Sequence, residues 1–236
     1  MQLCAYTHSR LNQRMAAKTI SGQNAALSFL QNAVELDLKK YTEKLDVYDI
    51  RYTEHLNGLT QENIVYTLES NESIIQATFA FVDKTLHHCG MFVIKGSPIY
   101  IRSQPTEIIN LAKKVLENFQ TYSSSEKSDD RDFAEMKNVL SSVKTIEDME
   151  TSLGSTKLKV TSNSNANYTA FELMHIINGI PFPGITIEFL NGTFCGLGDN
   201  WRVYQIGKTD INISKEDARK IALTYLRFFL ECNTRW

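Results

Sequence analysis

The sequence predicts an α+β fold of two similar units, each an antiparallel sheet with helices packed on one face. The first observation is a repeated motif. Cys89-Gly90 and Cys195-Gly196 lie about 105 residues apart, and each is followed by an acidic residue that opens an apolar helix. The second is that apolar residues alternate along several short segments, which is typical of half-buried strands. Repetition at the spacing of a domain indicates two copies of one unit.

The first half is expected to read helix, antiparallel meander, helix. Apolar residues at helical spacing predict a helix over residues 21–38. Alternating apolar residues predict strands over 47–52, 64–68, 75–81, 91–94 and 99–101. Asn57-Gly58 and Asn71 are predicted turns. Pro105 suits the first position of the next helix, because its missing N–H would be unpaired there, and an apolar stripe continues to Phe119.

The second half repeats this plan after a short helix over 133–143. Alternation predicts strands at 158–160, 168–177, 185–189 and 201–205, although the centre of the second segment could equally be helical. Turns are predicted at 178–179, 181–184, 191–192 and 195–200. Ser214 is a suitable N-cap for a last helix, whose buried face would run from Ala218 to Phe229. Glu147-Asp148 and Glu150 are interpreted as solvated helix surface.

These patterns divide the chain into three parts. Residues 1–20 are expected to be a flexible tail, because they lack the apolar run of a secretory signal. Residues 21–125 form the first predicted helix–sheet–helix unit and residues 126–236 the second. The polar, apolar-free stretch 123–130 is the predicted linker between them.

Composition narrows the classes of partner. Lys and Arg number 25 against 27 Asp and Glu, a net charge of -2, so the basic surplus of a nucleic-acid-binding protein is missing. No stretch approaches the roughly 20 apolar residues that span a bilayer, so we expect a soluble chain, with an anchor outside it left open. Asn-x-Ser/Thr sequences begin at Asn71, Asn167, Asn191 and Asn212 and suit an extracytoplasmic location.

Few residues suggest chemistry. The four cysteines, at positions 4, 89, 195 and 232, lack the spacing of zinc ligands; buried thiols or a single Cys89–Cys195 bridge are the two interpretations. His87-His88-Cys89 is the densest set of potential ligands, but neighbours on a strand point to opposite faces, so a polar turn is preferred. A Cys195 nucleophile with His175 as base is a weaker alternative. No catalytic, cofactor or metal site is predicted.

One segment carries a family resemblance. Asn212-Ile213-Ser214-Lys215-Glu216-Asp217-Ala218-Arg219-Lys220-Ile221-Ala222 resembles the opening of a PepSY-type module, and the stretch from Gln104 to Ala112 is a weaker second copy, with Ile109 in the place of Ala218. The wider pattern is similar in style to secreted or membrane-anchored archaeal proteins of helix–strand–helix construction. The resemblance implies an extracytoplasmic regulatory or inhibitory module without catalytic residues to carry over.

We therefore expect a non-enzymatic extracytoplasmic binding or regulatory protein, with inhibition of peptidases as one form of that role. Its partner would be a protein, with no cofactor and no nucleic acid; its oligomeric state is left open. One alternative is a small-ligand carrier with an aromatic-lined sheet concavity formed by Tyr48, Tyr52, Phe79, Phe81, Phe189 and Trp201. Another is an enzyme that uses Cys195 or Cys89.

Overall fold

A computed structural model describes residues 22–52, 60–124 and 131–200, together with Glu216 and Arg219. The chain divides into two compact units, Met1–Tyr204 and Gln205–Trp236, and the architecture below belongs to the first. Of the second unit, only Glu216 and Arg219 are described, and both are helical and exposed. The predicted tail, the turn at Asn57-Gly58, residues 125–130 of the linker, the strand at 201–205 and nearly all of the last helix lie outside the described residues.

The described chain forms nine strands, with helices before and between two runs of strands. The strands are β1 (Thr42–Tyr52), β2 (Thr60–Glu69), β3 (Ser73–Val82), β4 (Thr85–Gly96), β5 (Met149–Leu153), β6 (Thr156–Asn163), β7 (Tyr168–Ile177), β8 (Ile180–Leu190) and β9 (Thr193–Asp199). The helical elements are a first helix over residues 22–32, the 3₁₀ turn η1 (Leu38–Lys40), α2 (Ile108–Ser124) and α3 (Phe133–Ser141).

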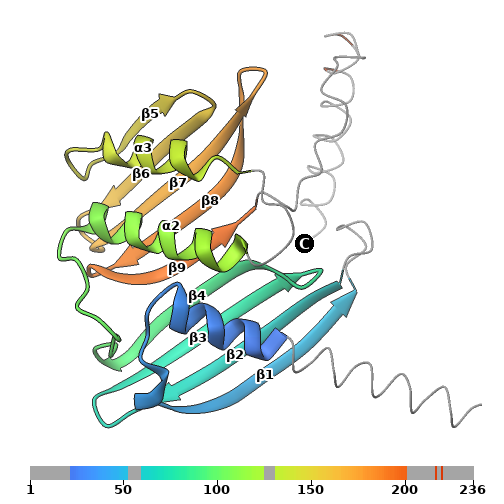
Figure 1. Cartoon of the computed structure of the whole chain (residues 1–236), viewed down its shortest axis with the longest axis vertical. Coiled ribbons are helices and arrows are strands. Elements are labelled where there is room, and N and C mark those ends of the chain that lie inside the picture. Colours follow the sequence, from blue (N-terminus) through green and yellow to red (C-terminus); the bar gives the residue numbers. More distant parts are fainter. Residues whose placement is uncertain (1–21, 53–59, 125–130, 201–215, 217–218, 220–236) are drawn as a thin grey trace, which may run out of the picture. The chain divides into compact units, whose positions relative to one another are not determined.

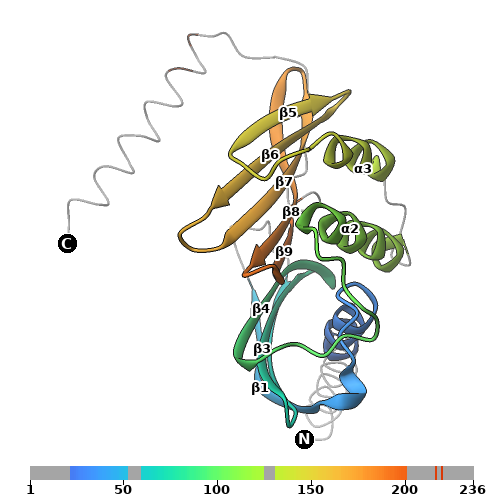
Figure 2. The same ribbon diagram turned by 90° about the vertical axis from the view of Figure 1, so that its left-hand side faces the viewer.

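All nine strands belong to one antiparallel sheet with the order β1-β2-β3-β4-β9-β8-β7-β6-β5 (Figure 1). The meander β1–β4 and the meander β5–β9 meet where β4 pairs with β9. The first helix, α2 and α3 cover the same face of this sheet (Figure 2). The predicted α+β fold, with an antiparallel sheet and helices on one face, is therefore present. The strands of the two halves form one sheet rather than two.

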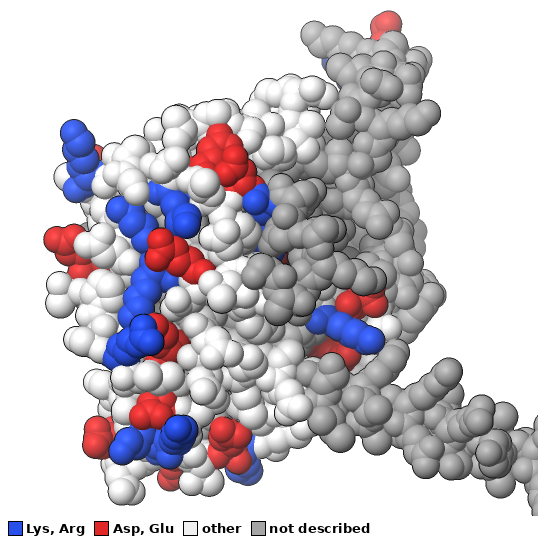
Figure 3. Space-filling view, viewed as in Figure 1, with Lys and Arg blue, Asp and Glu red and all other residues white. Residues whose placement is uncertain are grey.

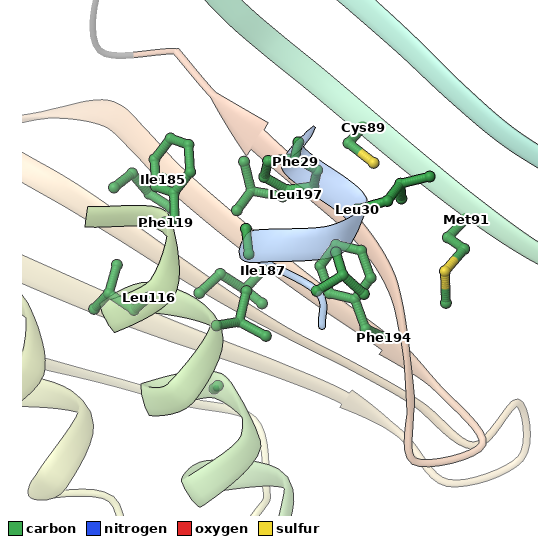
Figure 4. Close-up of a cluster of buried hydrophobic side chains, with 14 of the residues drawn as sticks. Phe29, Leu30, Cys89, Met91, Leu116, Phe119, Ile185, Ile187, Phe194 and Leu197 are labelled. Carbon is green, nitrogen blue, oxygen red and sulfur yellow. The ribbon is translucent and has the colours of Figure 1, made fainter. Parts of the chain in front are cut away.

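The helices are held by apolar stripes facing the sheet. The buried side chains of α2 are Leu111, Ala112, Val115, Leu116 and Phe119, and those of α3 are Phe133, Met136, Val139 and Leu140. Phe29 and Leu30 of the first helix lie with Cys89 and Met91 of β4 and with Phe194 and Leu197 of β9 (Figure 4). Burying a side chain of this size contributes about 1.5–3 kcal/mol. The first helix thus closes the core beneath the β4–β9 junction.

Several local predictions are confirmed. Ile64, Tyr66 and Leu68 of β2 are buried in alternation, and so are Ile75, Ala77, Phe79 and Phe81 of β3. The segment 168–177, whose centre could have been helical, is the strand β7. The turns after β7 and β8 are Asn-Gly pairs in which all four residues have positive φ, the conformation that two-residue hairpins require.

Other predictions are wrong, mainly where glycine, histidine or proline occurs inside a strand. His87-His88-Cys89 and Cys195-Gly196-Leu197-Gly198 were expected to be turns but lie within β4 and β9. Residues 181–184 were expected to be a turn but are part of β8, where β8 pairs with β7 and its register with β9 has not yet begun. Proline is tolerated in such a stretch, because its missing N–H would face the side that has no neighbouring strand. Glu150 lies on strand β5, not on a helix.

The connection between the halves also differs from the prediction. Residues 99–101 form no strand, and Tyr100 makes only an isolated bridge to Leu36. The helix α2 begins at Ile108 rather than at Pro105. This segment crosses from the end of β4 to the helix-covered face, where Ile99 N–H donates to the Tyr41 hydroxyl at 2.8 Å.

On the helix-covered face, basic and acidic side chains are interspersed (Figure 3). The pair of Lys137 on α3 with Glu117 on α2 belongs to this mixed surface. No helix of the described chain is both long and apolar enough to cross a membrane.

Candidate functional site

The sheet is interrupted at its centre. The β4–β9 ladder contains three residue pairs, His88 with Gly198, Cys89 with Leu197 and Gly90 with Gly196. Beyond Gly90, β4 continues through Met91–Gly96 with β3 as its partner. On the other side, Thr193 and Phe194 pair with β8. The two strands therefore diverge, and each leaves one backbone edge toward the gap.

This gap is a cleft of about 410 Å³, which we call the β4–β9 cleft. Its lining comes from β4, the segment that follows β4, the β8–β9 turn and β9. The lining residues are Met91, Phe92, Val93, Gly96, Ser97, Pro98, Leu190, Asn191, Thr193, Phe194 and Cys195.

Apolar side chains at this cleft remain accessible to solvent. Phe92 is 55% exposed, and Val93 and Leu190 are also exposed. Met91 and Phe194, by contrast, point into the core below (Figure 4). Contiguous exposed apolar groups beside a concavity mark binding sites more often than scattered single residues do. The cleft therefore offers both an apolar wall and an unfilled volume.

The β4–β9 ladder ends at two paired glycines, Gly90 and Gly196, which are next in the chain to the cleft residues Met91 and Cys195. A Cβ atom at Gly90 would lie 2.8 Å from Thr78 Oγ1 and 3.2 Å from the Phe92 ring, and one at Gly196 would lie 2.6 Å from Glu188 Oε2. Because glycine has no side chain, these neighbouring groups approach the backbone closely. His88, Gly90 and Phe92 alternate with the core residues of β4, so these three residues face the side of the sheet opposite the helices.

Glu188 is the charged neighbour of Tyr168, Cys195 and His88 at this end of the ladder. Its Oε1 accepts a hydrogen bond from the Tyr168 hydroxyl at 3.0 Å. Burial, together with the negative charge of Glu188, raises the pKa of Tyr168 to about 12 and that of Cys195 to about 11. Partial desolvation lowers the pKa of His88 despite the opposing effect of Glu188. At neutral pH, the tyrosine and the thiol are therefore protonated and His88 is neutral beside a carboxylate.

A second hollow of about 400 Å³ lies near the start of α2 and the turns after β6 and β8. Its lining is mostly hydroxyl and amide groups: Ile108, Ser162, Asn163, Ser164, Asn167, Tyr168, Thr169, Asn191 and Gly192. Asn167 and Asn191 there have positive φ, which is a plain turn role. Its lining lacks the apolar wall of the β4–β9 cleft.

Of the six predicted aromatic residues, the four whose side chains the structure describes do not form a common exposed face. Phe79, Phe81 and Phe189 are at most 2% exposed and belong to the core beneath the helices, so they cannot present a ligand face. Phe79 stacks on Phe81, whereas Phe189 contacts Phe171 and Phe194. Tyr48 is half-buried and donates to Glu62 at 3.2 Å. The Tyr52 side chain and Trp201 lie outside the described residues.

The structure does not bring the described cysteine and histidine candidates together into a disulfide, a nucleophile–base pair or a metal site. Cys89 and Cys195 are free thiols, and burial raises the pKa of Cys89. His175 lies seven residues along β7 from Tyr168, which is roughly 23 Å in an extended strand. Cys195 lies near Glu188, at the Tyr168 end of the strand, so His175 is too distant to act as its base. His87 Nδ1 donates to the Asp199 carbonyl at 2.8 Å. Within the described ranges, no three His, Cys, Asp or Glu side chains are grouped to hold a metal ion.

Two features were missed at the sequence level. Arg131 and Asp199 form a buried ion pair at 2.7 Å, with side chains 0% and 2% exposed, and the guanidinium lies over the rings of Phe119 and Phe133. Phe92 and Glu188 share one site only because β4 pairs with β9. The one available signal was the run Met91-Phe92-Val93-Ile94, which is apolar on both faces of a strand.

Comparison of the chain with models of protein families, with curated proteins and with solved structures finds no match.

Proposed function

We propose that this protein is a non-catalytic binding protein built from two similar halves, and that it binds an extended polypeptide segment of a partner in the β4–β9 cleft. The single observation that carries the proposal is the edge of β4 over Met91–Gly96, which lines an apolar cleft instead of pairing with β9. An added strand would supply the missing backbone partners, and its side chains would cover the apolar wall.

The duplicated plan supports this proposal through the position of the site. The repeated Cys-Gly sequences fall on β4 and β9, and their glycines, Gly90 and Gly196, are paired with each other. Such a pair is expected where a two-fold axis between two copies crosses the sheet. The halves differ in strand number, four against five. Two diverged copies would meet in a short ladder and leave a cleft where their strands no longer match.

The state of the thiols favours binding over thiol catalysis. A thiol with a pKa of about 11 is present as thiolate in about one molecule in ten thousand at pH 7. Catalytic cysteines have the opposite environment, in which a cation or a helix N-terminus lowers the pKa. Cys195 instead lies beside the negative charge of Glu188.

A regulatory role outside the cytoplasm, including inhibition of a peptidase, remains part of the proposal through the PepSY-like helix start at 212–222. Three of the Asn-x-Ser/Thr asparagines, Asn71, Asn167 and Asn191, are exposed at turns, where a glycosyltransferase could reach them. Purified protein tested against a panel of metallopeptidases and cysteine peptidases would show inhibition if this form of the role is correct.

A small-ligand carrier is the second candidate, because the cleft volume of about 410 Å³ falls within the range of small-molecule sites. It differs from the first candidate in needing no backbone pairing. An apolar dye that binds the cleft while no peptide does so would favour the carrier.

Selection from a random heptapeptide display library tests the primary proposal. Wild-type protein should enrich peptides that bind it and that lose at least tenfold in affinity to Phe92→Asp. Leu153→Asp is the matched control, since Leu153 is an exposed apolar residue on β5, away from the cleft. Failure to enrich any peptide over the Phe92→Asp protein would overturn the proposal.

A further inference from the structure

Resting on the proposed function, we propose that the segment bound in the β4–β9 cleft presents a lysine or arginine side chain to Glu188, beside the Gly90–Gly196 pair, with apolar residues on either side of it. The occupant is therefore a basic–apolar extended segment of another protein.

The first step concerns where an added strand would end. A strand paired with Met91–Gly96 lies between β4 and the diverging β9, and its inner end stops at the last ladder pair, Gly90 with Gly196. The residue at that inner end therefore lies next to these two glycines. The space directly over them is occupied by the Thr78 hydroxyl, the Phe92 ring and the Glu188 carboxylate, so a long side chain of the bound segment would meet the ring and the carboxylate there.

The second step concerns the group that this side chain meets. Glu188 Oε2 lies over Gly196, 2.6 Å from the position that a Cβ atom would take. The other oxygen, Oε1, accepts from the Tyr168 hydroxyl, which fixes the orientation of the carboxylate. Among the described residues, Oε2 has no hydrogen-bond donor and Glu188 has no ion-pair partner. An oriented carboxylate with one unused oxygen fits a charge-assisted hydrogen bond from an ammonium or guanidinium group.

The third step is charge complementarity. His88 and the thiol of Cys195 are uncharged at neutral pH, so among these three described groups beside the Gly90–Gly196 pair Glu188 carries the charge. The basic residue on the described edge of β4 is Lys95, five residues beyond Gly90 and roughly 17 Å away along the strand. An incoming cation is therefore attracted to the inner end, and an incoming carboxylate is repelled there.

The fourth step is the alternation of side chains in the added strand. A residue that faces Glu188 and Phe92 lies on the open face, so its two neighbours face Met91 and Phe194 on the core side. These neighbours should be apolar. The Phe92 ring adds a π-face beside the cation, which favours arginine or lysine over a neutral polar residue.

The test uses the heptapeptides enriched by the wild-type protein, resynthesised with acetylated N-termini and amidated C-termini. Each is made with lysine, glutamine or glutamate at its basic position, and binding is measured by fluorescence anisotropy. We expect the lysine form to bind at least tenfold more tightly than the glutamine form, and the glutamate form to bind more weakly still. In Glu188→Gln, the lysine and glutamine forms should bind equally. Glu172→Gln, a change at another half-buried carboxylate on β7, should keep the difference.

Each outcome decides between the two proposals. Enriched peptides without a basic residue, or a lysine form no tighter than the glutamine form on wild-type protein, would overturn this inference while leaving the cleft as a peptide site. A preference for lysine that survives Glu188→Gln would also overturn it, since another group would then hold the cation. Absence of any enriched peptide would overturn the proposed function itself.

Discussion

Gly90 on β4 and Gly196 on β9 face each other as the last residue pair before the two strands separate. The same pair joins the two meanders and adjoins the cleft residues Met91 and Cys195. A Cβ atom at either position would come within 3 Å of a neighbouring side chain, Thr78 or Glu188. The two glycines therefore connect the halves of the sheet and also allow Thr78 and Glu188 to lie close to the backbone beside the cleft.

Gly90→Ala should destabilise the protein by about 1–3 kcal/mol, the usual cost of overpacking. The added methyl group would lie 2.8 Å from Thr78 Oγ1 and 3.2 Å from the Phe92 ring, and a β-branched side chain has little freedom to move aside. Gly198→Ala is the control, because its nearest atom, Thr186 Cβ, would be 3.9 Å away. Urea denaturation measures both, and equal stabilities of the two variants would contradict the close approach at Gly90.

Arg131→Met should cost about 3–5 kcal/mol, because it removes the guanidinium that pairs with the buried Asp199 carboxylate. The loss would appear in the urea-unfolding free energy. Lys157→Ala, which removes the ion-pair partner of the exposed Glu150 carboxylate, should cost less than about 1 kcal/mol. A loss at Arg131 no larger than that at Lys157 would show that the core does not depend on the Arg131–Asp199 pair.

Glu135→Ala should cost about 1–3 kcal/mol by leaving polar groups of the β5–β6 turn without their acceptor. The Glu135 carboxylate accepts from the Ser155 hydroxyl at 2.9 Å and from the Thr156 N–H at 3.3 Å, and so ties α3 to this turn. Glu147→Ala, a change at an exposed carboxylate, serves as the control and should fall within about 0.5 kcal/mol of the wild type. Thermal unfolding compares the two variants, and similar melting temperatures would count against this role of Glu135.

The sequence predicted the elements whose pattern is local. The alternation of β2 and β3, the helical stripes of α2 and α3 and the two Asn-Gly hairpins all follow from neighbouring residues. The segments at His87 and Cys195 were misassigned, because glycine and histidine are poor indicators of a strand and their strands are defined by pairing with each other across the centre of the sheet. The cleft depends on that long-range pairing, so the proximity of Phe92 to Glu188 was not predictable from either segment.

Cys195 should react slowly with iodoacetamide at pH 7.5, and its rate should rise about tenfold per pH unit up to pH 10. Its pKa of about 11 leaves the thiolate fraction increasing throughout this window, whereas an ordinary cysteine, with a pKa near 8.5, levels off above about pH 9. Peptide mass mapping separates Cys195 from the other three cysteines.

Glu188→Gln should speed this reaction at pH 8, because removing the carboxylate charge lowers the pKa of the thiol toward its usual value. Glu172→Gln should leave the rate unchanged. An unaltered rate in Glu188→Gln would place the charge of Glu188 away from the cleft and would weaken the electrostatic account of the site.

Hydrogen–deuterium exchange of β4, with and without a peptide enriched by the wild-type protein, tests the central claim most directly. If the bound segment pairs with the open edge of β4, exchange of the backbone amides of Met91–Gly96 that point into the cleft should slow at least tenfold, because they gain hydrogen-bond partners. The amides of β1, at the far edge of the sheet, should exchange as before. Slowed exchange at β1 or β5 with unchanged exchange in Met91–Gly96 would contradict the assignment of the cleft as the binding site.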